Sequence, residues 1–373
     1  GRYPAAHGVH TGGSGALAPD AVTLAELLKS HGYKTGAFAA SLQLPPKYGL
    51  DQGFDVYAAS FGDAPRPSQV PEDGIPAGSV TDSAIEFLET SRGKPFFLWV
   101  NYFDPHYFYS PPEPFASRLA SNPYDGEVAY VDREAGRLMA KLRDYKIDQG
   151  TIIVLAGSNG EGLGDHGEDY HGSTLQEATT RVPLVITGQG FAAGARLDAP
   201  ASLVDLLPTL AQMLGVAPPE GVEGTSLLGL PDPARPLYLE AWLPAREFGW
   251  APLTGVVAGS LKYVAGARGE LYDVAADPNE TSELAEARPA DRDRLADLAR
   301  AYGARASATR SLDESLRTQI RALGYSSDPQ ERLARDPRDM VAVANDALKA
   351  DPSRAIPAED VRAEFEAKWA ARS

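Results

Sequence analysis

The chain has 373 residues and contains no cysteine, which removes several kinds of chemistry. Disulfides, thiolate metal sites and cysteine nucleophiles are all excluded within these residues. The chain also has no apolar run that approaches the roughly 20 residues of a membrane span. It has no basic block, and its formal net charge is −16, so a polyanion such as DNA would be repelled. We therefore expect no nucleic-acid partner and no membrane span. The lack of cysteine does not fix the cellular compartment.

The chain begins at Gly1 rather than at methionine, and no signal peptide precedes the first motif. The opening letters GRYPAAHGVHTGG are typical of the interior of a domain, so we expect a chain that is truncated at its N-terminus. The hydrophobic fraction is 43%, which is enough for a sizeable core, and the length predicts two to three domains.

Helical and strand patterns alternate over the first 214 residues, which predicts a doubly wound, mostly parallel α/β sheet. Thr23 and Glu26 have the spacing of a capping box, and Gly32 suits the end of the helix that they begin. Residues 41–78 are rich in Gly, Pro and Asp, and we expect a long surface excursion there. Further helices are expected at 79–91, 125–145 and 202–214, and strands at 34–40, 95–101, 151–155 and 181–187.

Three parts are expected along the chain: an α/β core at 1–235 whose N-terminal part is missing, a small antiparallel β subdomain at 236–284, and a helical C-terminal tail at 285–373. Short runs such as PLYLEAWL and LKYVAG, split by Gly, Pro and Asp, predict the small sheet. The tail is rich in Ala, Arg, Glu and Asp, and it offers a surface for protein contacts. Its helices are expected at 291–302, 312–323, 340–349 and 358–371.

The stretch from Thr151 to Gly172 organises the prediction of a site. It begins with the apolar run Ile152 to Leu155, which does not alternate and therefore predicts a strand buried on both faces. A polar loop rich in glycine follows directly. Because ligands of open α/β sheets bind beyond the carboxyl ends of the strands, a functional site is expected in this loop.

Two familiar motifs fit this loop poorly. Ser158 follows the strand in the form small–x–Ser–x–Gly, the shape of a nucleophile elbow. An elbow needs a helix after the serine and a later histidine, yet the next residues are broken by glycine and no histidine follows His171. The glycines at 160, 162 and 164 are spaced wrongly for a dinucleotide loop, and acidic residues crowd them.

The oxygens of the loop could bind a hard cation such as Ca²⁺. For each of its acids a solvated surface role is more common, and Asn159 is the exception because it lies nearest the strand end. His106 and His171 follow two different strands at the same predicted sheet edge, where two imidazoles could bind an oxyanion or protonate a leaving group. The remaining histidines are His7, His10 and His31, expected to have structural roles, and His166, for which both roles stay open.

An ordered series of short motifs resembles the sulfatase family of the alkaline-phosphatase-like superfamily over roughly residues 1–285. None of the motifs decides the matter alone, but their shared order is specific. They are Gly1-Arg2-Tyr3-Pro4, Thr23-Leu24-Ala25-Glu26-Leu27-Leu28 followed by Gly32-Tyr33-Lys34-Thr35, Gly53-Phe54-Asp55, Pro95-Phe96-Phe97-Leu98 with Asp104-Pro105-His106, Asn159-Gly160-Glu161, Glu177 with Arg181-Val182-Pro183-Leu184, Asp205-Leu206-Leu207-Pro208-Thr209-Leu210, and Leu271-Tyr272-Asp273 with Asp277-Pro278.

The resemblance implies hydrolysis of a small anionic sulfate ester with Ca²⁺ and a formylglycine nucleophile made from Cys or Ser. Related members cleave phosphate or phosphonate esters. Ser158 and Asn159 fall where the family has metal ligands, Asp followed by Asn or His. His106 and His171 fall where the family places residues that contact the sulfate, which makes them the expected catalytic and substrate-binding residues. A periplasmic or extracellular location would fit the family.

Two departures from the family limit the expected activity. The nucleophile and the first pair of metal-binding aspartates lie upstream of the Gly1-Arg2-Tyr3-Pro4 segment in the family and are absent from these residues. Ser158 replaces an expected aspartate, and loss of even a group that hydrogen-bonds to a metal's ligand weakens metal binding by about 10–100-fold. We therefore expect a sulfatase-like hydrolase that is inactive as the chain given, with Ca²⁺ binding weakened or absent. The alternatives are a phosphate or phosphonate ester hydrolase and a degenerate, non-catalytic binding module.

Overall fold

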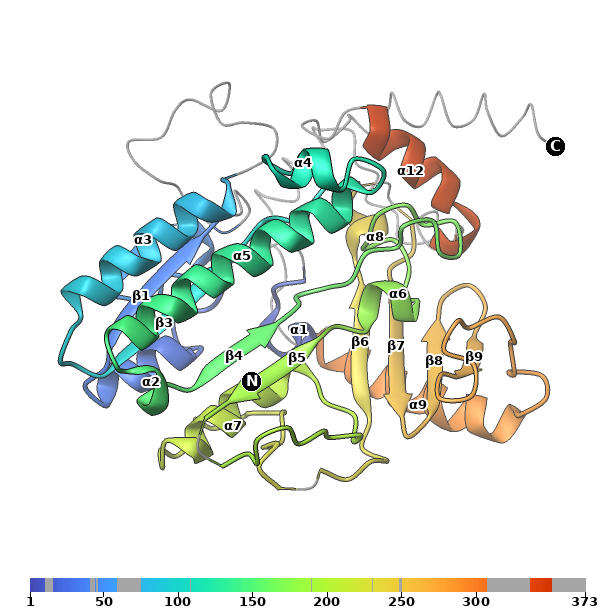
Figure 1. Ribbon diagram of the computed structural model, residues 1–373. Coiled ribbons are helices and arrows are strands. Elements are labelled where there is room, and N and C mark those ends of the chain that lie inside the picture. The colour runs from blue at the N-terminus through green and yellow to red at the C-terminus, as the bar shows by residue number, and fades with distance from the viewer. Residues whose placement is uncertain are drawn as a thin grey trace.

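The computed structural model describes residues 1–10, 16–40, 44, 46–58, 75–107, 109–188, 190–229, 231–247, 250–306 and 336–350 (Figure 1). The helices expected at 312–323 and 358–371 lie outside these residues, as does much of the surface excursion expected at 41–78.

The first sheet is parallel and has the order β2-β1-β3. It consists of β1 (Lys34–Ala39), β2 (Val56–Ala58) and β3 (Phe96–Asn101). Helix α3 (Ala77–Thr90) packs on β1 and β3, and the long helix α5 (Pro123–Asp144) packs on α3 (Figure 1). The short strand β2 lies inside the segment that was expected to be only surface excursion, so that expectation was wrong in part. Three residues are too few to show a period, and pairing with β1 determines the strand.

Helix α2 (Leu24–Ser30) begins with the expected capping box. The Thr23 hydroxyl accepts a hydrogen bond from the Glu26 backbone N–H at 3.1 Å, and the Glu26 carboxylate accepts one from the Thr23 N–H at 2.8 Å. Gly32 has φ +84°, the left-handed conformation that ends many helices. Local sequence therefore sets both ends of this helix and the start of β1.

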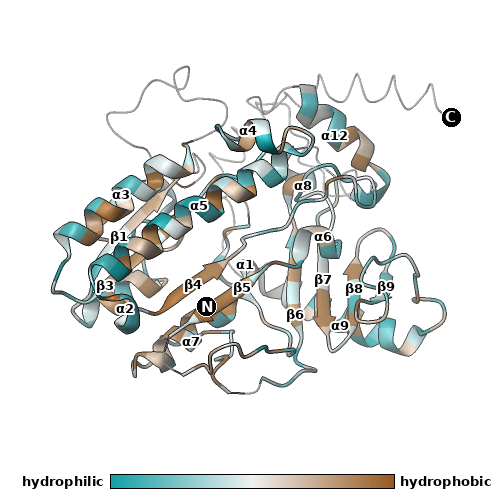
Figure 2. Cartoon of the chain, in the orientation of Figure 1, coloured by the Kyte–Doolittle hydropathy of each residue, from teal (hydrophilic) through white to brown (hydrophobic). Residues whose placement is uncertain are grey.

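The second sheet corrects two expectations. β4 (Ile153–Ala156) pairs with β5 (Leu184–Thr187) in antiparallel register, with Ile153 opposite Thr187. The turn after Thr187 therefore lies at the opposite edge from the turn after Ala156, whereas the mostly parallel sheet predicted from the sequence would place both turns at one edge. β4 is also not buried on both faces, because Leu155 is 48% exposed. Figure 2 shows the hydrophobic character of both strands. In the described part of the chain, neither strand pairs with any other strand.

The third sheet is antiparallel with the order β6-β7-β8-β9, as predicted for this part of the chain. Helix α9 (Pro289–Ala306) packs on its β7 and β8 strands (Figure 1). Their shared core includes Val256, Leu271 and Leu295, and it also takes in Tyr3 beside helix α1 (Pro4–His7). The division at 235 and 284 stays a prediction. The strands are β6 (Leu237–Ala241), β7 (Leu253–Ala258), β8 (Leu261–Ala265) and β9 (Glu270–Asp273).

The remaining helices are short. They are α4 (Phe115–Arg118), α6 (Glu177–Thr180), α7 (Leu206–Met213), α8 (Leu243–Glu247) and α12 (Val341–Ala350). Within the described ranges, every helix is too short or too polar to cross a membrane. Helix α12 packs against the loop that follows β4, where the Asn345 amide donates to the Gly167 carbonyl at 2.7 Å. The architecture is thus an α/β core with a parallel sheet, an appended antiparallel sheet and helices toward the C-terminus, as predicted.

Candidate functional site: a pair of imidazoles

The loops after β3 and β4 bring His106 and His171 together. Their ring centroids lie 5.5 Å apart, and the ring planes are inclined by 80°. β3 ends at Asn101 and β4 ends at Ala156, so the two histidines come from different sheets. The expected meeting of these two side chains is therefore observed, although the turn after Thr187 does not join them.

His106 is held by contacts on three sides. Its ring stacks on Phe103 with centroids 4.1 Å apart, and its Nδ1 lies 2.6 Å from the Tyr107 carbonyl oxygen. Since a carbonyl only accepts hydrogen bonds, Nδ1 carries the hydrogen. The backbone N–H of His106 donates to Glu127 of α5 at 3.1 Å, and Glu127 also accepts from the Ser110 N–H at 2.6 Å. These contacts leave Nε2 as the ring nitrogen available to a ligand.

The pKa of His106 is lowered from its ordinary value of 6.5. Burial is the main cause, because it disfavours the charged imidazolium, and the neighbouring His171 adds to the effect. The hydrogen bond to the Tyr107 carbonyl opposes the shift. At neutral pH His106 is therefore an uncharged hydrogen-bonding group, and an anion bound beside it would favour its protonation.

His171 is oriented by Glu161. The Nδ1 atom of His171 lies 3.1 Å from the Glu161 carboxylate, whose side chain is only 4% exposed. A carboxylate on Nδ1 selects the tautomer with hydrogen on that nitrogen and directs Nε2 toward the ligand. Glu161 is one of the loop acids considered as a cation ligand in the sequence, but its carboxylate bonds to His171 instead.

The loop that carries His171 is folded around a buried carboxylate and two closely packed glycines. Glu168 is almost fully buried and accepts hydrogen bonds from the Ser173 N–H, at 2.7 Å, and from the Thr174 hydroxyl. A Cβ atom at Gly160 would lie 2.0 Å from the Ala178 carbonyl oxygen, and one at Gly162 would lie 2.1 Å from the Glu168 carbonyl oxygen. Only glycine allows these close approaches of the backbone.

Ser158 and Asn159 are exposed and bond to each other directly after β4. The Ser158 hydroxyl donates to the Asn159 side-chain oxygen at 3.0 Å, and the Asn159 amide donates to the Gly160 carbonyl at 2.9 Å. Ca²⁺ takes six to eight oxygens and favours carboxylates. Across the described ranges, no cluster of three His, Asp or Glu residues could hold a metal ion. Two neutral neighbours do not fit Ca²⁺, so no step of the proposed chemistry passes through the ion.

The other candidates have structural partners. His166 contacts Asp165 at 2.9 Å and the Glu280 carbonyl at 3.2 Å, so its ring connects the loop to the C-terminal sheet. His7 and His31 contact backbone groups near them in sequence. Ser158 is not in a nucleophile elbow, because loop rather than helix follows it until α6 begins at Glu177.

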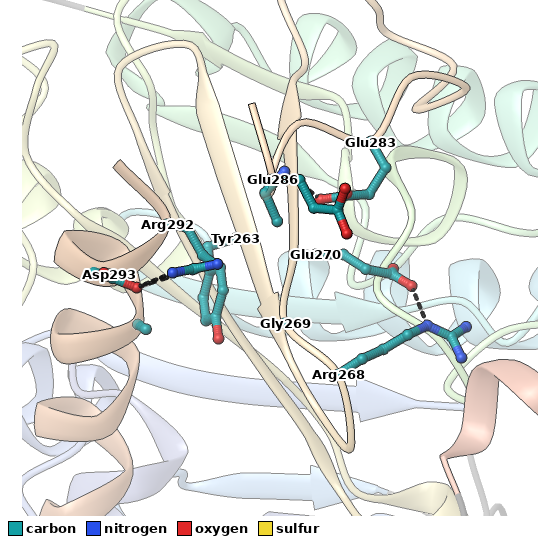
Figure 3. Close-up of a pocket in the computed structure, with 10 residues that line it drawn as sticks. Tyr263, Arg268, Gly269, Glu270, Glu283, Glu286, Arg292 and Asp293 are labelled. Carbon is teal, nitrogen blue, oxygen red and sulfur yellow. Dashed lines mark hydrogen bonds and ion pairs between the residues drawn. The ribbon is translucent and has the colours of Figure 1, made fainter. Parts of the chain in front are cut away.

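A separate cavity of about 560 Å³ lies between the β8–β9 hairpin and α9 (Figure 3). Both arginines that line it are paired with lining carboxylates: Arg268 with Glu270 at 2.8 Å, and Arg292 with Asp293 at 2.8 Å. None of its lining residues comes from the loops after β3 and β4. We therefore place the candidate site at the imidazoles and not in this cavity.

Two known proteins are similar in sequence to parts of this chain. Choline-sulfatase of Rhizobium meliloti (strain 1021) is 32% identical over 177 residues, which cover 45% of this chain and 34% of that protein. Arylsulfatase K of Mus musculus is 29% identical over 176 residues, which cover 43% of this chain and 32% of that protein. The matches thus span about a third of the length of these relatives.

Two solved structures have a similar fold. The structure of Ps i-CgsB has a TM-score of 0.70 and 18% identity, and the alignment covers 90% of this chain and 86% of that one. Phosphonate monoester hydrolase of Agrobacterium radiobacter has a TM-score of 0.64 and 20% identity, with 82% and 84% covered. At these identities the likeness concerns the fold alone. The sulfatase family model matches residues 1–216, more than half of the chain, and the chain therefore belongs to the sulfatase family.

Proposed function

We propose that His106 and His171 bind the sulfate group of a small sulfate ester, and that the protein is a hydrolase of such esters. One observation carries this proposal: the two rings lie 5.5 Å apart, and each Nδ1 is engaged by its own acceptor. Both Nε2 atoms can then serve one anion. Membership of the sulfatase family and the similarity to choline-sulfatase and arylsulfatase K support the choice of sulfate.

The chemistry of the pair follows from histidine itself. Because hydrogen sits on Nδ1, each Nε2 can donate a hydrogen bond to a sulfate oxygen once the ring is protonated, and this protonation adds a positive charge that offsets the charge of the ester. During cleavage, an imidazolium beside the departing alcohol oxygen can give up its proton as negative charge develops there. Glu161 and the Tyr107 carbonyl keep the two rings in the required tautomers.

We expect the chain as given to bind the anion without turning over the ester. The nucleophile that the family resemblance places before Gly1 is not among these residues, and no cysteine is present. A phosphate or phosphonate ester is the alternative substrate, because the same imidazoles would accept a tetrahedral anion of phosphorus. The structural similarity to a phosphonate monoester hydrolase supports that alternative. Titration with sulfate and with phosphate would separate the two.

Isothermal titration of the chain with inorganic sulfate and with 4-nitrophenyl sulfate tests the proposal. We expect both anions to bind, and we expect His106→Ala and His171→Ala each to weaken binding about 10-fold or more, since hydrogen bonds to charged groups contribute roughly 1.5–3 kcal/mol. His31→Ala is the matched control, because the exposed His31 lies at the end of α2. Equal affinity in all four proteins would overturn the proposal. Turnover of 4-nitrophenyl sulfate by this chain that His106→Ala abolishes would contradict only the expectation that the chain as given is inactive.

A second candidate, a non-catalytic binding module, rests on Ser158. A hydroxyl at this position is a weaker ligand for Ca²⁺ than the carboxylate that the family resemblance predicts. Micromolar Ca²⁺ binding by the complete protein would favour the hydrolase. Absence of Ca²⁺ binding, unchanged in Ser158→Asp, would favour the binding module, with the C-terminal helices as a possible surface for protein contacts.

A further inference from the structure

A second polar cluster lies at the end of strand β6, outside the imidazole pair. The Glu240 carboxylate is buried, with 7% of its side chain exposed, and its Oε1 lies 2.7 Å from Nδ1 of His10. The His10 ring packs on the Trp242 indole with centroids 4.5 Å apart. Three side chains from segments more than 220 residues apart in sequence thus form one cluster.

Two polar atoms of this cluster are buried without a partner. Oε2 of Glu240 accepts no hydrogen bond from the described part of the chain, and Nε1 of Trp242 donates none to it. Burial, then the charge of Glu240 and a side-chain interaction with it, raise the pKa of Tyr238, the neighbouring phenol on β6, while the Oε2 atom itself stays without a hydrogen-bond partner. A buried carboxylate oxygen and a buried indole N–H are each costly to leave unpaired, so a missing polar group is indicated.

The cluster adjoins the candidate site through a direct contact. Leu243 follows Trp242 in the chain, and Gly172 follows His171. A Cβ atom built on Gly172 would lie 3.3 Å from the Leu243 side chain, so the two backbones pass close to each other. Figure 1 shows β6 leading into α8 beside the segment that runs from β4 to α6. The cluster at the end of β6 therefore lies next to the loop that carries His171.

The two unpaired atoms define the chemistry of the missing group. One is an acceptor and the other is a donor, so a single group that serves both atoms would have to donate and accept a hydrogen bond. A quaternary ammonium does neither, and a primary ammonium would leave the Trp242 N–H unpaired. A hydroxyl satisfies both atoms, and the aromatic surface of His10 and Trp242 suits the C–H face of a polyol. Water would also satisfy both atoms, and a substrate hydroxyl could displace it.

We propose that His10, Glu240 and Trp242 form a subsite for a hydroxyl group on the alcohol part of the ester, and that they make the site selective for hydroxylated esters, such as sulfated saccharides, over simple alkyl or aryl sulfates. This proposal rests on the function proposed above. The Glu240 carboxylate accepts from the substrate hydroxyl, and the Trp242 indole donates to the same oxygen. His10, whose side chain is 15% exposed, holds Glu240 through its Nδ1.

Isothermal titration with three probes, inorganic sulfate, methyl sulfate and glucose 6-sulfate, tests this subsite. In the unchanged chain we expect glucose 6-sulfate to bind about tenfold more tightly than methyl sulfate, as two hydrogen bonds of ordinary net strength would provide. In Glu240→Gln and in Trp242→Phe we expect this advantage to fall to less than about twofold, with the affinities for methyl sulfate and inorganic sulfate unchanged. Trp99→Phe, in the parallel sheet beside Phe54, is the matched control and should keep the full advantage.

The outcomes separate the subsite from the proposed function. If inorganic sulfate binds but glucose 6-sulfate has no advantage over methyl sulfate, the subsite holds only water and the proposal is wrong, while the imidazole site stands. If none of the three probes binds, both proposals are wrong. A Trp242→Phe protein that fails to fold does not block the test, because the indole N–H signal of the unchanged chain should shift with glucose 6-sulfate and not with methyl sulfate. An unshifted signal would overturn the subsite.

Discussion

The imidazole of His106 stands nearly perpendicular to that of His171, with 5.5 Å between the ring centroids. Each ring is anchored at Nδ1, His106 by a backbone carbonyl and His171 by the Glu161 carboxylate. A carbonyl and a carboxylate are both acceptors, so both rings carry hydrogen at Nδ1. This common orientation supports the proposal that two loops following different sheets bind one anion.

The lowered pKa of His106 gives anion binding a pH dependence. Because burial lowers this pKa below 6.5, the folded protein holds fewer protons at His106 than the unfolded chain does in the acidic range. His106 therefore lowers the stability of the fold as the pH falls below 6.5. This loss of stability is complete once the pH is below the pKa of His106 in the folded protein. A bound sulfate favours the imidazolium and opposes that loss. We expect sulfate affinity to rise as the pH falls below 6.5, with proton uptake on binding.

Calorimetry in buffers of different ionisation heat measures that proton uptake. His106→Gln, which keeps a hydrogen-bonding group without titrating there, should remove part of the uptake. Sulfate affinity that is independent of pH between 5 and 7 would contradict the assignment of His106 to the anion site.

Gly162→Ala should disturb the loop that carries His171. The added methyl carbon would lie 2.1 Å from the Glu168 carbonyl oxygen, so the backbone must move, at a cost of about 1–3 kcal/mol or more. Gly136→Ala in α5 is the matched control, since its added carbon meets no atom within 4 Å and should stabilise the helix by about 0.5–1 kcal/mol. Urea unfolding measures both changes. Gly162→Ala should also weaken sulfate binding, and a neutral effect on both quantities would show that the loop does not need this close packing.

Lys262→Met should be strongly destabilising. The fully buried ammonium of Lys262 lies 3.0 Å from Glu177 and 3.0 Å from Glu280, and a buried pair that loses one partner costs about 3–5 kcal/mol. The Glu280 carbonyl also receives the contact from His166, so this cluster connects the C-terminal sheet with the loop of the site. Thermal unfolding measures the loss. Adding Glu177→Gln and Glu280→Gln should recover most of it, whereas a triple variant no more stable than Lys262→Met would show that charge imbalance is not the cause.

Ser158→Asp should increase the affinity of the chain for Ca²⁺. The unchanged site offers two neutral side chains after β4, and a carboxylate would add a charged ligand. We expect the Ca²⁺ affinity to rise about 10-fold or more. Removing even a group that only hydrogen-bonds to a metal's ligand lowers metal affinity by about 10–100-fold. Calorimetric Ca²⁺ titration measures the gain, and Ser121→Asp, at an exposed serine away from this loop, is the matched control. Equal Ca²⁺ binding in the unchanged chain and in Ser158→Asp would show that position 158 does not face a cation site.

Local signals in the sequence predicted much of the fold. The capping box at Thr23 and the left-handed Gly32 are decided within a few residues, and so were predictable. The direction of β5 was not, because antiparallel pairing with β4 depends on how the chain returns to the sheet. The apolar run of β4 suggested burial on both faces, but Leu155 is half exposed because burial depends on neighbouring strands and helices rather than on the run itself.

The candidate site was predictable to the extent that it follows strand ends. His106 and His171 could be paired from the sequence because each follows the end of a strand, although the two strands belong to different sheets. Glu161 was visible only as one of several loop acids, and nothing local shows that its carboxylate turns to His171. The contact between His10 and Glu240 spans 230 positions and has no local sign at all, so a structural role was the natural expectation for His10.

The most direct test of the central claim is a crystal of this chain soaked in selenate, a heavier analogue of sulfate whose anomalous scattering locates the anion. We predict an anomalous peak between the Nε2 atoms of His106 and His171, within hydrogen-bond distance of both, and no such peak in His106→Ala. A peak elsewhere on the molecule together with none between the two rings would contradict the assignment of this imidazole pair to the anion.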